Sequence, residues 1–404
     1  MDFKILKNGV KIVHEQSNSN VSHFGIIINS GTRDEETHEF GLAHFIEHAL
    51  FKGTKKRKAY HILSRMDDVG GEINAFTTKE DTTIHASFLT PYYKRAIELI
   101  YDIVFNSVFP EKELVKEKDV VIDEINSYKD SPAELIFDEI EDVLYENKPL
   151  GHNILGTKPN IKRFQKKNIS DFIDRTYATD QIVLCSVGNI KFERLVKYIE
   201  KYFEHLTASN FKREIIDYSD YTPKQIVKNK KTYQTHCILA NQAYKLDHDK
   251  RIGMFLLNNL LGGPALNSRL NLNIREKYGF AYNLDSNYHP FTDTGIFEIY
   301  FGTEKGNFDM SLELIRKELD KLRDNKLGTL QLSKAKKQLI GQLAISSESN
   351  ENKMLSIGKS FLHFNKVDEL EVVMNKIESI QATELMDIAN EVFDFGKMSM
   401  LVYK

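Results

Sequence analysis

The chain has 404 residues, of which 41% are hydrophobic and 28% are charged, and its formal net charge is −3. This composition is typical of a globular protein with room for two domains, and the charge does not favour nucleic acid or an anionic membrane as a partner. Two isolated cysteines, Cys185 and Cys237, form no disulfide framework, and no apolar run reaches the roughly 18 residues of a membrane helix. The first residues lack the features of a signal peptide. We therefore expect a cytoplasmic protein without a membrane segment.

The predicted elements of the first half alternate between strands and helices. Two short strands flank an Asn-Gly turn within residues 1–16, and a third strand covers 21–31. Later come a β-hairpin at 71–89 and a buried strand at 181–188. The predicted helices are 40–51, 60–69, 93–106, 111–129, 133–145 and 192–203. The polar stretch 206–224 is the best candidate for a linker.

The second half repeats this order of elements. Residues 235–263 can be laid beside 21–53, and residues 296–315 match 83–100. We therefore predict an α+β fold of two homologous domains, 1–212 and 213–404, which arose by internal duplication. Each domain should hold a mixed, mostly antiparallel sheet backed by helices. Where the first half has "HFIEH", the second has "FLLNN", so only the first domain carries candidate ligands.

The stretch "GLAHFIEHALF" places three ionisable residues in an apolar helix. His44 and His48 are four residues apart and face the same way, which suits two imidazoles on one zinc ion. Glu47 lies on the same face, where it can take a proton from a water that zinc has made acidic. The pattern H-x-x-E-H is the reverse of the H-E-x-x-H found in many zinc peptidases.

Chance, or a buried structural pair of histidines, would also explain this motif. However, ionisable groups in an apolar helix cost several kcal/mol unless they are paired or bound to metal. The metal interpretation is therefore favoured.

A third ligand is expected because a catalytic zinc normally has three protein ligands and one open position. The predicted helix 111–129 offers Glu117 and Glu124, which are seven residues apart and fall on one stripe of the helix. One could bind the metal while the other holds a histidine or the water. Such a charged helix is, however, more often a solvated face. Spacing alone does not choose between the two glutamates.

These residues resemble the pitrilysin-like zinc metallopeptidases, in their short form with two domains per subunit, and the resemblance covers essentially the whole chain. It implies that His44 and His48 bind zinc and that Glu47 is the general base. The third ligand of the family lies about 76 residues after the second histidine, in a segment similar to "VVIDEI", which implies Glu124. Glu117 then matches the supporting glutamate of the family, seven residues earlier.

Three further segments match the same family. In "GGEINAFTTKEDT", the resemblance implies an edge strand whose Asn74 and Ala75 face the substrate. In "REKYGFAY", Arg275 and Tyr282 have the family spacing of seven, and both side chains can donate to a carbonyl oxygen that becomes an oxyanion. Without the resemblance, the default interpretation is an arginine in a loop and a tyrosine in a strand, each bound to structural partners. In "PLGHNILGT", His152 is expected to be structural rather than a ligand.

Together these features predict a zinc-dependent metalloendopeptidase with one zinc per chain, which hydrolyses peptides or unfolded polypeptide segments. The alternatives are a catalytically silent family member that serves as a partner or scaffold, and a zinc protein outside the family. Two-chain relatives divide the zinc motif and the Arg/Tyr pair between unlike subunits, whereas this chain carries both. The resemblance therefore implies a homodimer with sites completed across its interface.

Overall fold

The computed structural model describes residues 1–404 and divides the chain into two compact units. Unit 1 comprises Met1–Asn126, His152–Arg213 and Ile345–Val367, and unit 2 comprises Ser127–Gly151, Glu214–Ala344 and Asp368–Lys404. Relative to the predicted halves 1–212 and 213–404, each unit thus includes one segment from the other half. No helix combines the length and the apolar character that crossing a membrane requires.

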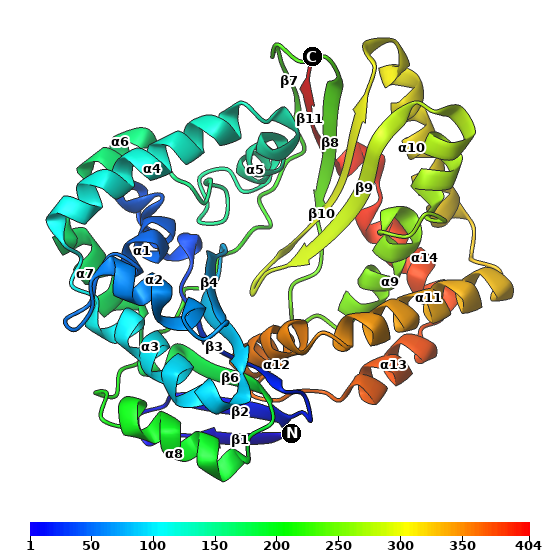
Figure 1. Ribbon diagram of the computed structural model, residues 1–404. Helices are drawn as coiled ribbons and strands as arrows, with labels where there is room; N and C mark the ends of the chain where they lie inside the picture. The colour runs from blue at the N-terminus through cyan, green and yellow to red at the C-terminus, as the bar shows by residue number, and fades with distance from the viewer. The chain divides into compact units, whose positions relative to one another are not determined.

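Unit 1 is built on a six-stranded sheet in the order β1-β2-β6-β3-β5-β4 (Figure 1). Its strands are β1 (Asp2–Ile5), β2 (Lys11–Gln16), β3 (Val21–Ile28), β4 (Glu72–Thr77), β5 (Thr82–Leu89) and β6 (Ile182–Gly188). Only β2 and β6 pair in parallel, and the other neighbours are antiparallel. The sheet is therefore mixed and mostly antiparallel, and β4 lies at one edge.

Helices cover both faces of this sheet because its central strands are apolar on both sides. In β3, Ile26 and Ile28 belong to the large core formed with most of the unit's helices, whereas Ile27 belongs to a smaller core under α12. The α-helices of unit 1 are α1 (Leu42–Leu50), α2 (Ala59–Asp67), α3 (Tyr93–Asn106), α4 (Glu111–Lys129), α6 (Lys158–Arg163), α7 (Lys166–Thr176), α8 (Phe192–Phe203) and α12 (Asn350–Phe364). Short 3-10 turns occur at η1 (Thr32–Asp34), η2 (Thr37–Glu39), η3 (Thr90–Tyr92) and η4 (Thr179–Gln181).

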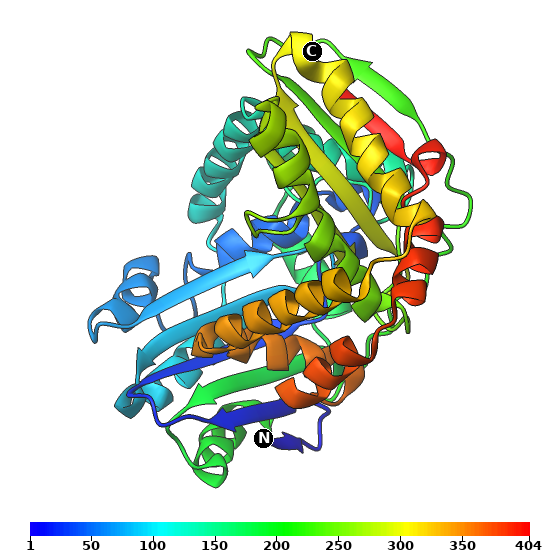
Figure 2. The same ribbon diagram turned by 90° about the vertical axis from the view of Figure 1, so that its right-hand side faces the viewer.

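Unit 2 contains a five-stranded sheet in the order β7-β11-β8-β10-β9, whose strands are labelled in Figure 1 and seen from another side in Figure 2. Its strands are β7 (Gln225–Lys228), β8 (Thr235–Gln242), β9 (Ala281–Pro290), β10 (Gly295–Thr303) and β11 (Ser399–Tyr403). Its helices are α5 (Pro132–Leu144), α9 (Arg251–Gly262), the π-helix η5 (Asn271–Glu276), α10 (Phe308–Asp324), α11 (Thr329–Ser347), α13 (Leu370–Ser379), α14 (Ala382–Val392) and the 3-10 turns η6 (Lys305–Asn307) and η7 (Phe395–Lys397). One face packs against α9, α10 and α14, and the other packs against α5.

The two sheets share one pairing scheme. The sole parallel pair, β7 with β11, corresponds to β2 with β6, and the antiparallel neighbours follow in the same sequence. This agreement confirms the predicted α+β fold with two mixed sheets, each backed by helices. Helix α5 comes from the first half of the sequence and packs on the unit 2 sheet, whereas α12 comes from the second half and packs on the unit 1 sheet. Each buries its apolar stripe on the sheet face that the unit's other helices leave open. Burying each large apolar side chain contributes about 1.5–3 kcal/mol, which favours this covering.

Candidate metal centre

Helix α1 carries both histidines of the motif on one face. The helix begins after Gly41, whose φ of 96° lies in the left-handed region, and it buries Phe45, Ile46 and Leu50 in the core of unit 1. His44 and His48 are one turn apart, and their ring centroids are 4.7 Å from each other. The apolar stripe thus fixes the helix, and the opposite stripe presents two imidazoles side by side.

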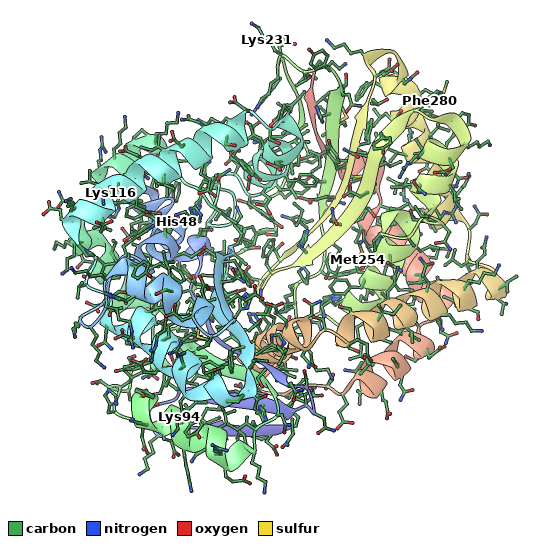
Figure 3. All side chains as sticks on the ribbon, viewed as in Figure 1. His48, Lys94, Lys116, Lys231, Met254 and Phe280 are labelled. Atoms are coloured by element: carbon green, nitrogen blue, oxygen red, sulfur yellow. The ribbon has the colours of Figure 1, made fainter.

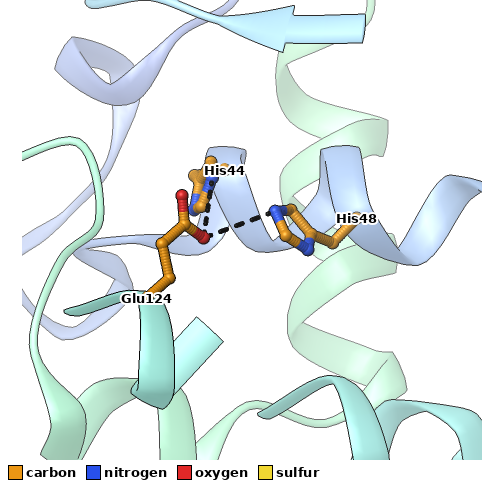
Figure 4. Close-up of side chains that lie close together, drawn as sticks. All are labelled: His44, His48 and Glu124. Carbon is orange, nitrogen blue, oxygen red and sulfur yellow. Dashed lines mark ion pairs between the residues drawn. The ribbon is translucent and has the colours of Figure 1, made fainter. Parts of the chain in front are cut away.

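Helix α4 brings a carboxylate to these imidazoles. Oε2 of Glu124 lies 3.7 Å from Nε2 of His44 and 3.6 Å from Nε2 of His48 (Figure 4). A tetrahedral zinc with bonds of 2.0–2.1 Å to nitrogen keeps its donor atoms about 3.4 Å apart. The spacing of these three side chains therefore fits a single zinc ion, and together they form a possible metal site.

The chemistry of the donor set also fits a cation. Oε2 of Glu124 is buried and has no hydrogen-bond partner, although it faces two ring nitrogens. Burial, helped by the neighbouring His48, lowers the pKa of His44 to about 3, so His44 offers a lone pair instead of a proton. A carboxylate and a neutral imidazole that face each other lack a positive charge between them, and a divalent ion supplies it.

Glu117 supports the cluster from behind His48. Its Oε1 lies 2.8 Å from Nδ1 of His48, and its Oε2 lies 2.6 Å from Nζ of Lys52. Burial alone would raise the pKa of Glu117, but the bonds to His48 and Lys52 lower it, so the carboxyl group is ionised. An ionised partner on Nδ1 holds the proton there and turns the Nε2 lone pair toward Glu124. Lys116, on the same helix, points to solvent instead (Figure 3).

Glu47 lies on α1 with the two histidines, and its carboxyl group is hydrogen-bonded to strand β4. Its Oε2 accepts a hydrogen bond of 2.6 Å from the hydroxyl of Thr77 in β4. Burial raises the pKa of Glu47, and the bond from Thr77 opposes part of this rise. A carboxyl group whose pKa is raised toward neutrality is suited to accept and return a proton.

Asn74 and Ala75 lie in β4, which pairs with β5 on one side only. The N–H of Thr78 donates to the carbonyl of Asp81 at the turn. In an antiparallel pair, every second residue directs its N–H and C=O to the partner strand, and the residues between direct theirs away. Counting back along β4, the N–H and C=O of Ala75 point away from β5 toward the open edge. Its main chain is therefore free to pair with an additional strand.

Arg275 and Tyr282 lie together in unit 2. Arg275 is in η5 and Tyr282 is in β9, and Cζ of the arginine is 5.0 Å from the centre of the tyrosine ring. Tyr282 is 73% exposed, so its hydroxyl is accessible. The structure thus brings these two residues together in unit 2, and the histidine cluster lies in unit 1.

Comparisons with known proteins place the chain in a family. Residues 11–158 match the family model described as insulinase (peptidase family M16), and residues 163–339 match the peptidase M16 inactive domain. The zinc protease YmxG of Bacillus subtilis (strain 168), described as uncharacterized, is 32% identical over 96% of this chain and 94% of its own length. The chain belongs to peptidase family M16.

Further similar proteins agree with this chain in length or in fold. A zinc protease of Rickettsia bellii (strain RML369-C), also described as uncharacterized, is 30% identical over 98% of this chain and 96% of its own. A solved protease from Helicobacter pylori superposes with a TM-score of 0.91 at 20% identity, covering 100% of this chain and 99% of that one. A solved peptidase M16 inactive domain from Pseudomonas fluorescens superposes with a TM-score of 0.92 at 19% identity, covering 100% of this chain and 97% of that one. The predicted family and two-domain form are confirmed.

Sequence reasoning missed two residues that support the candidate metal site. Thr77, which binds Glu47, shares a face of β4 with Ala75, so strand parity could have found it once Ala75 was assigned. Glu35 contacts the start of α1 through bonds to the main chain of Gly41 and Ala43, and no sequence pattern indicated it. His152 lies 3.0 Å from Glu35 and is outside the metal cluster.

Replacing Glu117 with alanine is expected to weaken metal binding or activity by about 10–100-fold, because His48 loses the carboxylate that fixes its proton and orientation. Zinc affinity, measured by competition with a chelating dye, would test this. Glu113→Ala is the matched control, since Glu113 is on the same helix and pairs with the exposed Lys116. Equal affinities for the two variants would contradict the supporting role of Glu117.

Proposed function

We propose that this M16 protein is a zinc-dependent metalloendopeptidase that hydrolyses peptides or unfolded polypeptide segments. One observation carries the proposal: His44, His48 and Glu124 converge within metal-binding distance, and Glu47 is on the same helix. The relatives named zinc proteases support this reaction class. Family members that serve only as partners would not need this complete set of donors.

Glu47 is the proposed general base. Zinc bound by His44, His48 and Glu124 would polarise the scissile carbonyl and make a water molecule more acidic. Glu47 accepts a proton from the attacking water and returns it to the leaving amine nitrogen. The hydroxyl of Thr77 donates to Oε2 of Glu47, and the main-chain N–H of Thr77 also bonds to this carboxylate, so Thr77 fixes the group that exchanges the proton. Glu117 keeps His48 in the orientation and proton state that the site requires.

The substrate is proposed to bind as an added strand on the open edge of β4. Ala75 offers an outward N–H and C=O, and Asn74 lies beside it with an exposed side chain. This mode reads the main chain more than the side chains, so cleavage of many sequences is expected. Arg275 and Tyr282 are proposed to donate hydrogen bonds to the carbonyl oxygen as its negative charge develops.

Metal analysis of the purified protein beside a peptide-library digest tests this function. About one zinc per chain is expected, since the cluster offers a single set of donors. Removal of the metal by a chelator should abolish cleavage, and added zinc should restore it. Full cleavage by the metal-free protein would contradict the proposal, as would a zinc-loaded protein that cleaves no peptide.

We also propose that two copies of the chain form a homodimer in which Arg275 and Tyr282 serve the metal site of the partner. A symmetric dimer makes such an exchange reciprocal. The support is that one chain carries both groups of residues, which two-chain relatives divide between unlike subunits.

Mixing two inactive variants tests the shared site. Glu47→Gln and Arg275→Ala chains, unfolded and refolded together in equal amounts, should give mixed dimers in which one of the two sites is complete. About half of the dimers are mixed, and each mixed dimer has one complete site out of two. About a quarter of wild-type activity is therefore expected. Differently tagged chains would verify that hybrids form. Hybrids as inactive as both parents would rule out the exchange.

A further inference from the structure

A buried pair of side chains, Glu35 and His152, caps the start of α1. Oε1 of Glu35 accepts a hydrogen bond of 2.7 Å from the N–H of Ala43, and Oε2 accepts one of 2.9 Å from Gly41. Nε2 of His152 lies 3.0 Å from the same Oε2. The first N–H groups of a helix have no partner within it, so this carboxylate satisfies them from outside.

Both members of the pair are shielded from solvent. The side chain of Glu35 is 0% exposed and that of His152 is 8% exposed. A buried carboxylate is costly unless it is hydrogen-bonded, and a helix N-terminus favours its negative charge. Burial raises the pKa of Glu35 well above its usual range, and the N–H groups of Ala43 and Gly41 oppose this rise. His152 completes the set of partners around the carboxyl group.

Several contacts fix His152 in its place. Its ring stacks on Phe40 with centroids 3.8 Å apart and planes at 8°. Its carbonyl accepts a hydrogen bond of 2.5 Å from Nζ of Lys79, in the turn between β4 and β5. A Cβ added to Gly156 would lie 2.1 Å from the carbonyl oxygen of Phe40, so the loop around His152 packs directly on the chain that enters α1.

The capped start of α1 is connected to the metal cluster by the main chain of the helix. Ala43, which donates to Glu35, immediately precedes His44. To share a metal ion, His44 must lie close to Glu124, which belongs to a different helix, α4. In the structure, Nε2 of His44 is 3.7 Å from Oε2 of Glu124. Metal sites require their donors to be held within about 0.5 Å of the productive geometry. A looser first turn of α1 would therefore disturb His44 before His48.

We propose that Glu35 and His152 are positioning residues that fix the start of α1 and thereby the spacing between His44 and Glu124. This inference rests on the metal site of the proposed function. Neither residue belongs to the metal cluster of His44, His48 and Glu124. Their effect passes through the main chain of Gly41 and Ala43.

The test measures metal binding directly, with cobalt(II) as the probe. Apo-protein of the wild type and of His152→Ala, Glu35→Gln and His152→Gln is titrated with cobalt well below its unfolding temperature, and affinity and the visible d–d spectrum are recorded. His152→Ala and Glu35→Gln should bind cobalt about 10-fold or more weakly, with a changed spectrum. His152→Gln should recover part of the loss, because its amide N–H can still donate to Glu35.

His14→Ala is the matched control. His14 is also a buried histidine of unit 1, its Nε2 lies 3.0 Å from the carbonyl of Ile190, and its ring stacks on Phe192. Its removal should lower the unfolding temperature in the same way but leave cobalt affinity and spectrum unchanged. A merely structural role for His152 predicts that the two variants behave alike.

The outcomes separate this inference from the proposed function. Wild-type affinity and spectrum in His152→Ala would overturn the positioning role. If that variant does not fold, an unchanged affinity in Glu35→Gln would overturn the role equally well. A wild-type protein that binds no divalent metal would overturn both proposals. A wild type that binds cobalt but cleaves no peptide would overturn the peptidase function alone, and the comparison of variants would still decide the role of Glu35 and His152.

Discussion

Replacing Glu47 with glutamine is expected to lower peptide cleavage by at least about 100-fold while the protein stays folded and binds zinc. Glutamine has the same shape and still accepts the hydrogen bond from Thr77, but its amide does not take a proton from water. The metal donors His44, His48 and Glu124 are unchanged. Cleavage rates and zinc content, measured on the same preparation, check both halves of this expectation.

Glu39→Gln is the control for this variant. Glu39 is also a buried carboxylate close to α1 in sequence, but it pairs with Arg175, accepts from the N–H of Glu36, and is not part of the metal cluster. Its replacement should reduce stability and leave the cleavage rate of the folded protein nearly unchanged. Undiminished cleavage by Glu47→Gln would show that another group activates the water.

Replacing Glu124 with alanine is expected to remove the metal. The variant keeps two imidazoles but loses the donor that lies 3.6–3.7 Å from both of them. The loss of zinc affinity should exceed the roughly 10–100-fold expected for Glu117→Ala, because a ligand is lost instead of its support. Equilibrium dialysis with zinc, followed by metal analysis, measures the difference.

Asp123→Ala is the matched control on the same helix. Asp123 is the preceding residue, its side chain is exposed, and the helical repeat turns it about 100° away from Glu124. Its removal should leave zinc content unchanged. If Glu117→Ala released the metal and Glu124→Ala retained it, the assignment of ligand and support would have to be reversed.

The sequence by itself determined the features that depend on local geometry. His44, Glu47 and His48 share a face of α1 because residues three and four apart always do so on a helix. The predicted helices 111–129 and 192–203 coincide with α4 and α8, since their apolar periodicity is regular. The repeated order of elements likewise predicted two mixed sheets, each backed by helices.

Tertiary structure decided everything that depends on how distant elements meet. Glu117 and Glu124 lie on one stripe of α4, so helical spacing alone left both open; only the packing of α4 against α1 sets Glu124 before the two Nε2 atoms and Glu117 behind His48. The positions of α5 and α12 depended on which sheet faces remained uncovered, a property of the assembled unit. Glu35 and His152 are 117 residues apart and share no pattern, because their contact arises where two loops cross at the start of α1.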